Sequence, residues 1–102
     1  MKTVIKFARK SRHPYFKHAT LILKGSRVMA WGVNHDHIHS ERDAACQIRN
    51  LQRCLIINVR VTKTGRIANS KPCPECETYL KSRGAKKVIY STPKGFIEEI
   101  YG

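Results

Sequence analysis

Four short apolar segments of the chain predict β-strands. They cover 18–24, 28–33, 54–62 and 86–91. The third is rich in β-branched residues and alternates toward its end, as strands do. Lys24-Gly25-Ser26-Arg27 separates the first two segments, and its glycine permits the positive φ that tight turns need. The first two strands are therefore expected to form a hairpin.

Apolar residues at helical spacing predict helices between the strands. Over 39–52, three of them fall on one stripe at i, i+4 and i+7, namely Ala44, Ile48 and Leu51. A second helix is predicted over 73–83, with prolines at its start and Gly84 at its end. Short helices are also expected over 3–11 and in the tail, 96–101.

The order of these elements is α-β-β-α-β-α-β followed by the tail. A strand, a helix and a strand again imply a crossover, and hence parallel pairing in part of the sheet. No linker or repeat divides the 102 residues, and an apolar fraction of 41% suffices for a core. We expect one domain over 1–102, an α/β sandwich with a mixed sheet.

Positive charge dominates the composition. Twenty Lys and Arg face seven Asp and Glu, a net charge of +13, and residues 1–35 hold no acid at all. Such a field attracts polyanions and favours nucleic acid or a phosphorylated substrate. A solubility role, or a basic face covered by a partner chain, remains open. No signal peptide and no apolar run of roughly 18 residues are seen, so a cytoplasmic protein without membrane contact is expected.

Two motifs at predicted helix starts carry the candidate chemistry: His39-Ser40-Glu41 and Pro72-Cys73-Pro74-Glu75-Cys76. Cys73 and Cys76 share one helix face. With His39 they supply three zinc ligands and leave the fourth position for water, as catalytic zinc sites do. Glu41 falls beside the metal, where a carboxyl can act as base and then as acid. His-x-Glu followed by Pro-Cys-x-x-Cys is the signature of zinc nucleobase deaminases.

With these motifs the chain resembles the cytidine deaminase-like superfamily over residues 3–91, nearest the deoxycytidylate and the tRNA-adenosine or polynucleotide deaminases. The resemblance implies the cytidine deaminase-like fold in a near-minimal form, a three-layer α/β/α sandwich. The same resemblance implies hydrolytic conversion of cytosine to uracil, with release of ammonia, in a nucleotide or a single-stranded nucleic acid. It also implies a set of substrate contacts, made by Asn34, Ser40, Lys71 and Tyr90. The family usually has alanine where Ser40 stands.

Alternatives to this interpretation stay open. The target base is adenine in RNA or tRNA under one of them. Under another, the chain is a non-catalytic zinc module that binds nucleic acid, although such a module does not need Glu41. A thiol redox protein would use Cys73 and Cys76. Asn34 has a structural alternative as a turn residue, and Tyr90 as a core aromatic. A homo-oligomer is an expectation from the family alone.

The remaining chemically notable residues have plainer interpretations. His35 and His37 extend the first motif to His-x-His-x-His, which could hold a second metal, but a polar loop at the pocket rim is preferred. Cys46 and Cys54 lack ligand spacing and are expected to pack in the core. Trp31 is expected in the core or in a subunit interface rather than stacked on a substrate.

Overall fold

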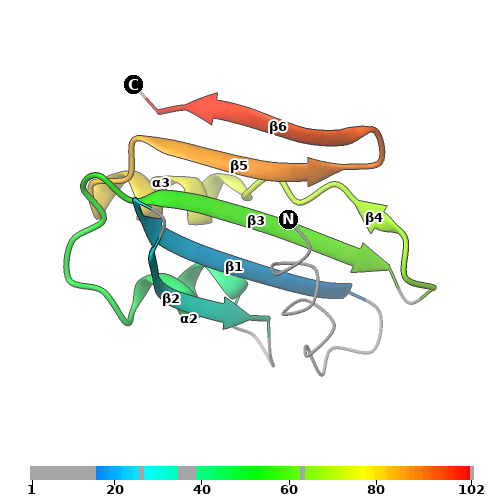
Figure 1. The fold of residues 1–102 in the computed structure, drawn as a ribbon, viewed down its shortest axis with the longest axis horizontal. Helices are drawn as coiled ribbons and strands as arrows, with labels where there is room; N and C mark the ends of the chain where they lie inside the picture. The colour runs from blue at the N-terminus through cyan, green and yellow to red at the C-terminus, as the bar shows by residue number, and fades with distance from the viewer. Residues whose placement is uncertain (1–15, 26, 35–38, 63, 102) are drawn as a thin grey trace.

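The computed structural model describes residues 16–25, 27–34, 39–62 and 64–101. Its six strands form one mixed sheet in the order β2-β1-β3-β5-β6, with the short β4 paired to β3 (Figure 1). The strands are β1 (Phe16–Lys24), β2 (Arg27–Val33), β3 (Leu55–Thr62), β4 (Ile67–Ala68), β5 (Lys87–Thr92) and β6 (Gly95–Ile100). The described helices are α2 (Ser40–Ala45) and α3 (Pro74–Ser82).

Strand pairing confirms the predicted hairpin and crossover. β1 pairs antiparallel with β2 on one side and with β3 on the other. β3 and β5 run parallel, and α3 lies in the connection between them. The two-residue β4 was not predicted, because Ile67 and Ala68 are too few to show a strand pattern. The mixed sheet expected from the element order is therefore present.

Alternate residues of the strands supply two separate apolar clusters. Ile22 and Ile56 pack on the face that carries Ala44 of α2 and Leu80 of α3. Their neighbours along the strands, Leu21 and Ile57, belong with Val59 to the cluster on the opposite face. Figure 1 shows α2 and α3 behind the sheet. The helix predicted over 3–11 lies outside the described residues, so the third layer of the sandwich stays a prediction.

The first described helix is shorter than the predicted 39–52. α2 ends at Ala45, and the next backbone N–H groups, of Gln47 and Ile48, bond carbonyls three residues back, so the last turn tightens. The Arg83 guanidinium then binds the carbonyls of Ala45 and Ile48. This tertiary contact satisfies carbonyls that a longer helix would have used. Neither described helix is long and apolar enough to cross a membrane.

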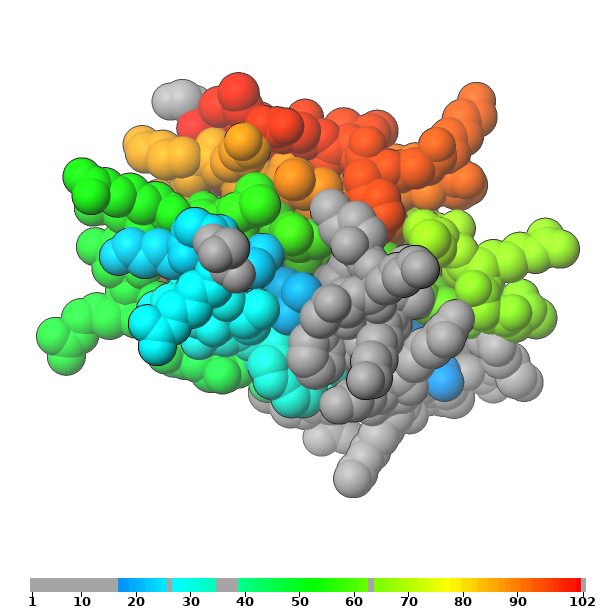
Figure 2. Space-filling model, viewed as in Figure 1, coloured from blue at the N-terminus to red at the C-terminus, as the bar shows by residue number. Residues whose placement is uncertain are grey.

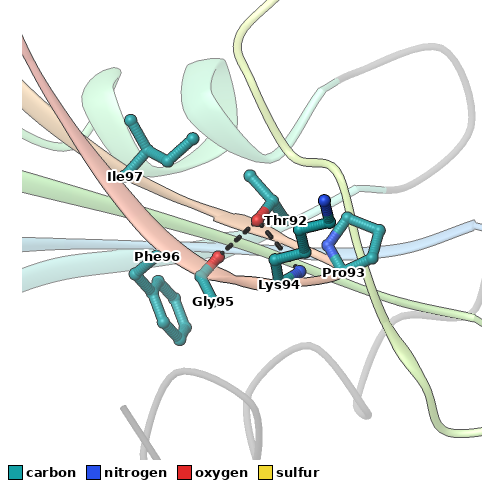
Figure 3. Close-up of a pocket in the computed structure, with 6 residues that line it drawn as sticks. All are labelled: Thr92, Pro93, Lys94, Gly95, Phe96 and Ile97. Carbon is teal, nitrogen blue, oxygen red and sulfur yellow. Dashed lines mark hydrogen bonds between the residues drawn. The ribbon is translucent and has the colours of Figure 1, made fainter.

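The predicted helix in the tail is wrong, because 95–100 forms strand β6. Its residues pair antiparallel with β5, and the turn between the two strands contains Gly95 at φ 129. Figure 3 shows this turn, where Thr92 Oγ1 donates to the Gly95 carbonyl (2.8 Å) and accepts from the Lys94 N–H (3.2 Å). Because β5 offers an open edge, the tail gains a full ladder of hydrogen bonds as a strand.

Candidate metal centre

The starts of α2 and α3 bring His39, Cys73 and Cys76 together. One ligand atom from each lies within 4.8 Å of the others. The Sγ–Nδ1 distances to His39 are 3.8 Å from Cys73 and 3.3 Å from Cys76. His39 caps α2, Cys73 caps α3, and Cys76 lies in the first turn of α3. The donor set and its spacing fit a metal ion, and the predicted ligands are those that converge.

The three side chains of this cluster differ in their exposure to solvent. His39 is exposed, Cys73 is half-buried and Cys76 is buried at 2% exposure. Burial raises the pKa of the Cys76 thiol, and the nearby Glu41 and Cys73 raise it further. The thiol therefore keeps its proton at neutral pH until a cation displaces it. A metal held here is reached from the His39 side and shielded on the Cys76 side.

The carboxyl of Glu41 is buried next to this cluster, at 4% exposure in the first turn of α2. Ser40 Oγ lies 2.9 Å from Glu41 Oε1 as a hydrogen-bond donor. A buried carboxyl is costly without partners. Its position at a helix start, where backbone N–H groups are unsatisfied, offsets part of that cost.

A buried polar chain leads from Glu41 into the sheet. Thr20 Oγ1 lies 2.9 Å from Ser40 Oγ and 2.6 Å from Asn58 Oδ1. The Asn58 amide nitrogen donates to the Ser70 carbonyl at 3.4 Å, so the Asn58 oxygen faces Thr20 as an acceptor.

Two hydroxyl hydrogens serve the three contacts of this chain. If Ser40 donates to an ionised Glu41 and Thr20 donates to Asn58, the Thr20–Ser40 contact has no hydrogen. A hydrogen on Glu41 instead completes a continuous chain through both hydroxyls to Asn58. Rotation of the Ser40 hydroxyl alone therefore switches the network between these two hydrogen-bond patterns.

Sequence reasoning missed Thr20 and Asn58. Both are fully buried within their strands, at 0% and 1% exposure, and they face each other in the β1–β3 register. Fully buried polar side chains need a partner. The available signal was a single polar residue in the middle of each predicted strand. Only the pairing of β1 with β3 shows that the two residues meet.

Close packing at Gly32 sets the position of α2. A Cβ at this residue would lie 2.4 Å from the backbone nitrogen of Ala44, so the helix rests directly on β2. Asp43 Oδ2 accepts the N–H of Val33 at 3.0 Å and ties the helix to the same strand. These two contacts determine where the residues at the start of α2 lie.

The predicted substrate contacts differ in their surroundings. Asn34 Oδ1 accepts the N–H of His18 at 2.9 Å, which extends the β1–β2 ladder. Lys71 is exposed and its Nζ lies 3.6 Å from Glu99 Oε2. Tyr90, at 8% exposure, belongs to the core cluster under the helices. Substrate contact by these residues stays a prediction.

The other sequence predictions have mixed outcomes. His35 and His37 lie outside the described residues. Cys54 is buried as expected, at 7% exposure. Cys46 is exposed, so its predicted core packing is wrong: it lies just beyond the end of α2, where its Sγ contacts the Asp43 carbonyl. Trp31 is 40% exposed on the edge strand β2, so it is not a core residue.

Two open hollows lined by described residues lie near helix or strand ends. One, of about 380 Å³, lies beside the metal cluster and is lined by Arg42, Pro74, Glu75 and Thr78. The other, of about 390 Å³, lies at the β5–β6 turn drawn in Figure 3, and none of its lining residues belongs to the predicted site.

The sequence was compared with known proteins. No protein-family model matches the chain, and no curated protein matches it at a significant level.

Proposed function

We propose that this protein is a zinc-dependent hydrolytic deaminase that converts cytosine to uracil in a nucleotide or a single-stranded nucleic acid. The observation that carries the proposal is the buried carboxyl of Glu41 beside the cluster of His39, Cys73 and Cys76. A group of three donors and a neighbouring carboxyl is what hydrolytic zinc chemistry requires.

The donor count favours a catalytic over a structural site. Structural zinc sites are closed by four protein ligands, whereas catalytic sites use three. Among the described residues, three His or Cys side chains converge here, and the exposed His39 is on the open side. The nearby Glu41 carboxyl has no purpose in a closed site, and burying it there would only cost stability.

Zinc at this cluster would supply a Lewis acid that lowers the pKa of a bound water toward 7. Glu41 takes a proton from the attacking water and delivers it to the ring nitrogen, which makes the neighbouring carbon electrophilic. The water oxygen bonds to this carbon, and Glu41 takes the second proton, from the new hydroxyl, and delivers it to the amine. The C–N bond then breaks, the carbonyl of uracil forms and ammonia leaves. The hydroxyls of Ser40 and Thr20 hold the carboxyl in place through both protonation states.

Substrate contacts in this proposal follow the family resemblance. The backbone N–H of Ser40 donates to the base carbonyl, and the backbone carbonyl of Lys71 accepts from the base amine. Asn34 contacts the sugar or base, and Tyr90 lines the pocket. The +13 net charge attracts the phosphates of the substrate.

The test is ammonia release by the zinc-loaded protein from cytidine, deoxycytidylate, adenosine and a cytosine-containing single-stranded oligonucleotide. Glu41→Gln keeps the shape of the side chain but cannot carry a proton. We expect it to retain stoichiometric zinc and to lose about 10²–10⁴-fold in kcat, the usual worth of positioned acid–base catalysis.

Glu98→Gln is the matched control, because Glu98 is an exposed carboxylate on β6 that pairs with Lys87. It should deaminate at the wild-type rate. Near-wild-type turnover by Glu41→Gln would refute the proposal. Turnover of adenosine alone would show that the target base is adenine. Zinc binding without turnover of any of the four substrates would favour the alternative of a non-catalytic zinc module.

A further inference from the structure

Four cations line the end of the sheet that lies away from the metal cluster. Arg27 begins β2, Lys24 ends β1, and Arg53 and Lys86 come just before β3 and β5. All four side chains are exposed. In Figure 2 the segments that carry them, coloured blue to cyan, green and light orange, meet at the left end of the molecule. We refer to these four residues as the cation row.

Strand register aligns the cation row across four neighbouring strands. Lys24 pairs with Arg27, Leu23 pairs with Leu55, and Ile56 pairs with Val88. Each row member is therefore at or next to the end of its strand, and adjacent strands lie about 4.8 Å apart. Asn58, at the foot of the Glu41 network, is three residues from Leu55, which corresponds to about 10 Å of strand, and Arg53 lies two residues before Leu55.

The cation row meets no carboxylate among the described residues. Those carboxylates lie in the first turns of the two helices and on β6, namely Glu41, Asp43, Glu75, Glu77, Glu98 and Glu99. The ion pairs in the described part of the chain engage other lysines, Lys71, Lys81 and Lys87. The charge of the row is therefore available to an external anion.

Backbone conformation singles out Arg53. Its φ is 62°, in the left-handed region, where every other described residue with positive φ is a glycine. A residue with a long side chain is strained in this conformation, and such strain is retained where the side chain has a task. Glycine would fit the backbone better but would remove the guanidinium.

We propose that the cation row binds the phosphate backbone of a nucleic acid strand, at a surface separate from the metal centre. Exposed cations at the same end of four adjacent strands match a chain of phosphates. The row itself contains no aromatic side chain for stacking on bases, so it binds without regard to base sequence. Arg27 and Arg53 supply guanidinium forks, and Lys24 and Lys86 supply point charges, both of which suit phosphate oxygens.

The test measures binding of a fluorescent single-stranded oligothymidylate by anisotropy over a range of salt concentrations. Thymine has no exocyclic amine to lose, so binding is read without turnover, and the result stands apart from the deaminase proposal. The row variant Lys24→Gln/Lys86→Gln is compared with Arg66→Gln/Lys94→Gln. Arg66 and Lys94 are exposed cations in turns at the other end of the sheet, so both variants lose the same net charge.

Each phosphate contact on a single strand contributes about 0.7 to the slope of log K against log salt. We expect the row variant to lose about 1.4 of that slope and about 25-fold in affinity at 0.1 M salt. The control variant should lose less than about 3-fold, the effect of net charge alone. Equal losses in the two variants would overturn the proposal. Binding of polyglutamate as tight as that of the oligonucleotide would also overturn it, in favour of an acidic protein partner.

Arg53→Gly separates binding from folding. It removes one cation and relieves the backbone, so the melting temperature should stay level or rise while oligothymidylate affinity falls about 5-fold at 0.1 M salt. A lower melting temperature with unchanged affinity would show that Arg53 serves the fold, and would remove it from the proposed surface.

Discussion

Replacing Thr20 with valine tests the buried polar chain under Glu41. Valine has the same shape but no hydroxyl, and Thr20 is 0% exposed, so no water replaces the lost contacts. Asn58 Oδ1 loses a donor at 2.6 Å, and Ser40 Oγ loses a neighbour at 2.9 Å. An unsatisfied buried acceptor costs about 1–3 kcal/mol. The added methyl offsets a minor part of this.

We expect Thr20→Val to lower the free energy of unfolding by about 2 kcal/mol, which corresponds to a fall of about 10 °C in melting temperature for a domain of this size. The assay is urea unfolding followed by circular dichroism and tryptophan fluorescence, with and without zinc. Thr64→Val, at an exposed threonine, should stay within about 0.5 kcal/mol of wild type.

The double variant Thr20→Val/Asn58→Leu is a second test of the same buried hydrogen-bond network. Replacing both partners with apolar groups leaves fewer orphaned polar atoms than replacing one. The loss in the double variant should therefore be smaller than the sum of the single losses, by about 1 kcal/mol. Two results would refute a coupled network of these side chains: a free energy of unfolding of Thr20→Val within about 0.5 kcal/mol of wild type, or losses in the double variant that are strictly additive.

Three further predictions concern packing and metal binding. Gly32→Ala places a Cβ against Ala44, so it should cost about 1–3 kcal/mol by urea unfolding and weaken zinc binding, because α2 must shift. An unchanged zinc affinity in a destabilised Gly32→Ala protein would uncouple α2 from the metal. Zinc affinity should rise with pH between about 6 and 8, because burial raises the pKa of the Cys76 thiol and zinc must displace its proton. Calorimetry in buffers of different ionisation enthalpy should show at least one proton released per zinc ion bound. A zinc affinity that does not change with pH would contradict this prediction. Tyr101→Ala should lower the free energy of unfolding by about 3 kcal/mol, because the side chain is 4% exposed in the core and Lys81 Nζ lies 5.0 Å from the ring centroid. A loss below about 1 kcal/mol in urea unfolding would show that this ring does not stabilise the core.

The sequence by itself determined the cluster of three candidate metal ligands and most of the sheet. Spacing of i, i+3 places Cys73 and Cys76 on one helix face wherever that helix packs, and a histidine at the start of the preceding helix completes the set. Gly25 and Gly65 are in turns with positive φ, as short polar segments between apolar runs predict. These signals are local, because they depend on a few neighbouring residues and on backbone sterics.

Tertiary structure alone decided the features that depend on which segments pair. The tail became a strand because the edge of β5 offers hydrogen bonds that a six-residue helix cannot match. Beyond Ala45 the helix does not continue, and the guanidinium of Arg83, distant in sequence, binds the carbonyls of Ala45 and Ile48 there. Thr20 and Asn58 became one network because β1 pairs with β3 in a register that sets them opposite each other. Sequence periodicity records which face a residue occupies, but not the residue that it meets there.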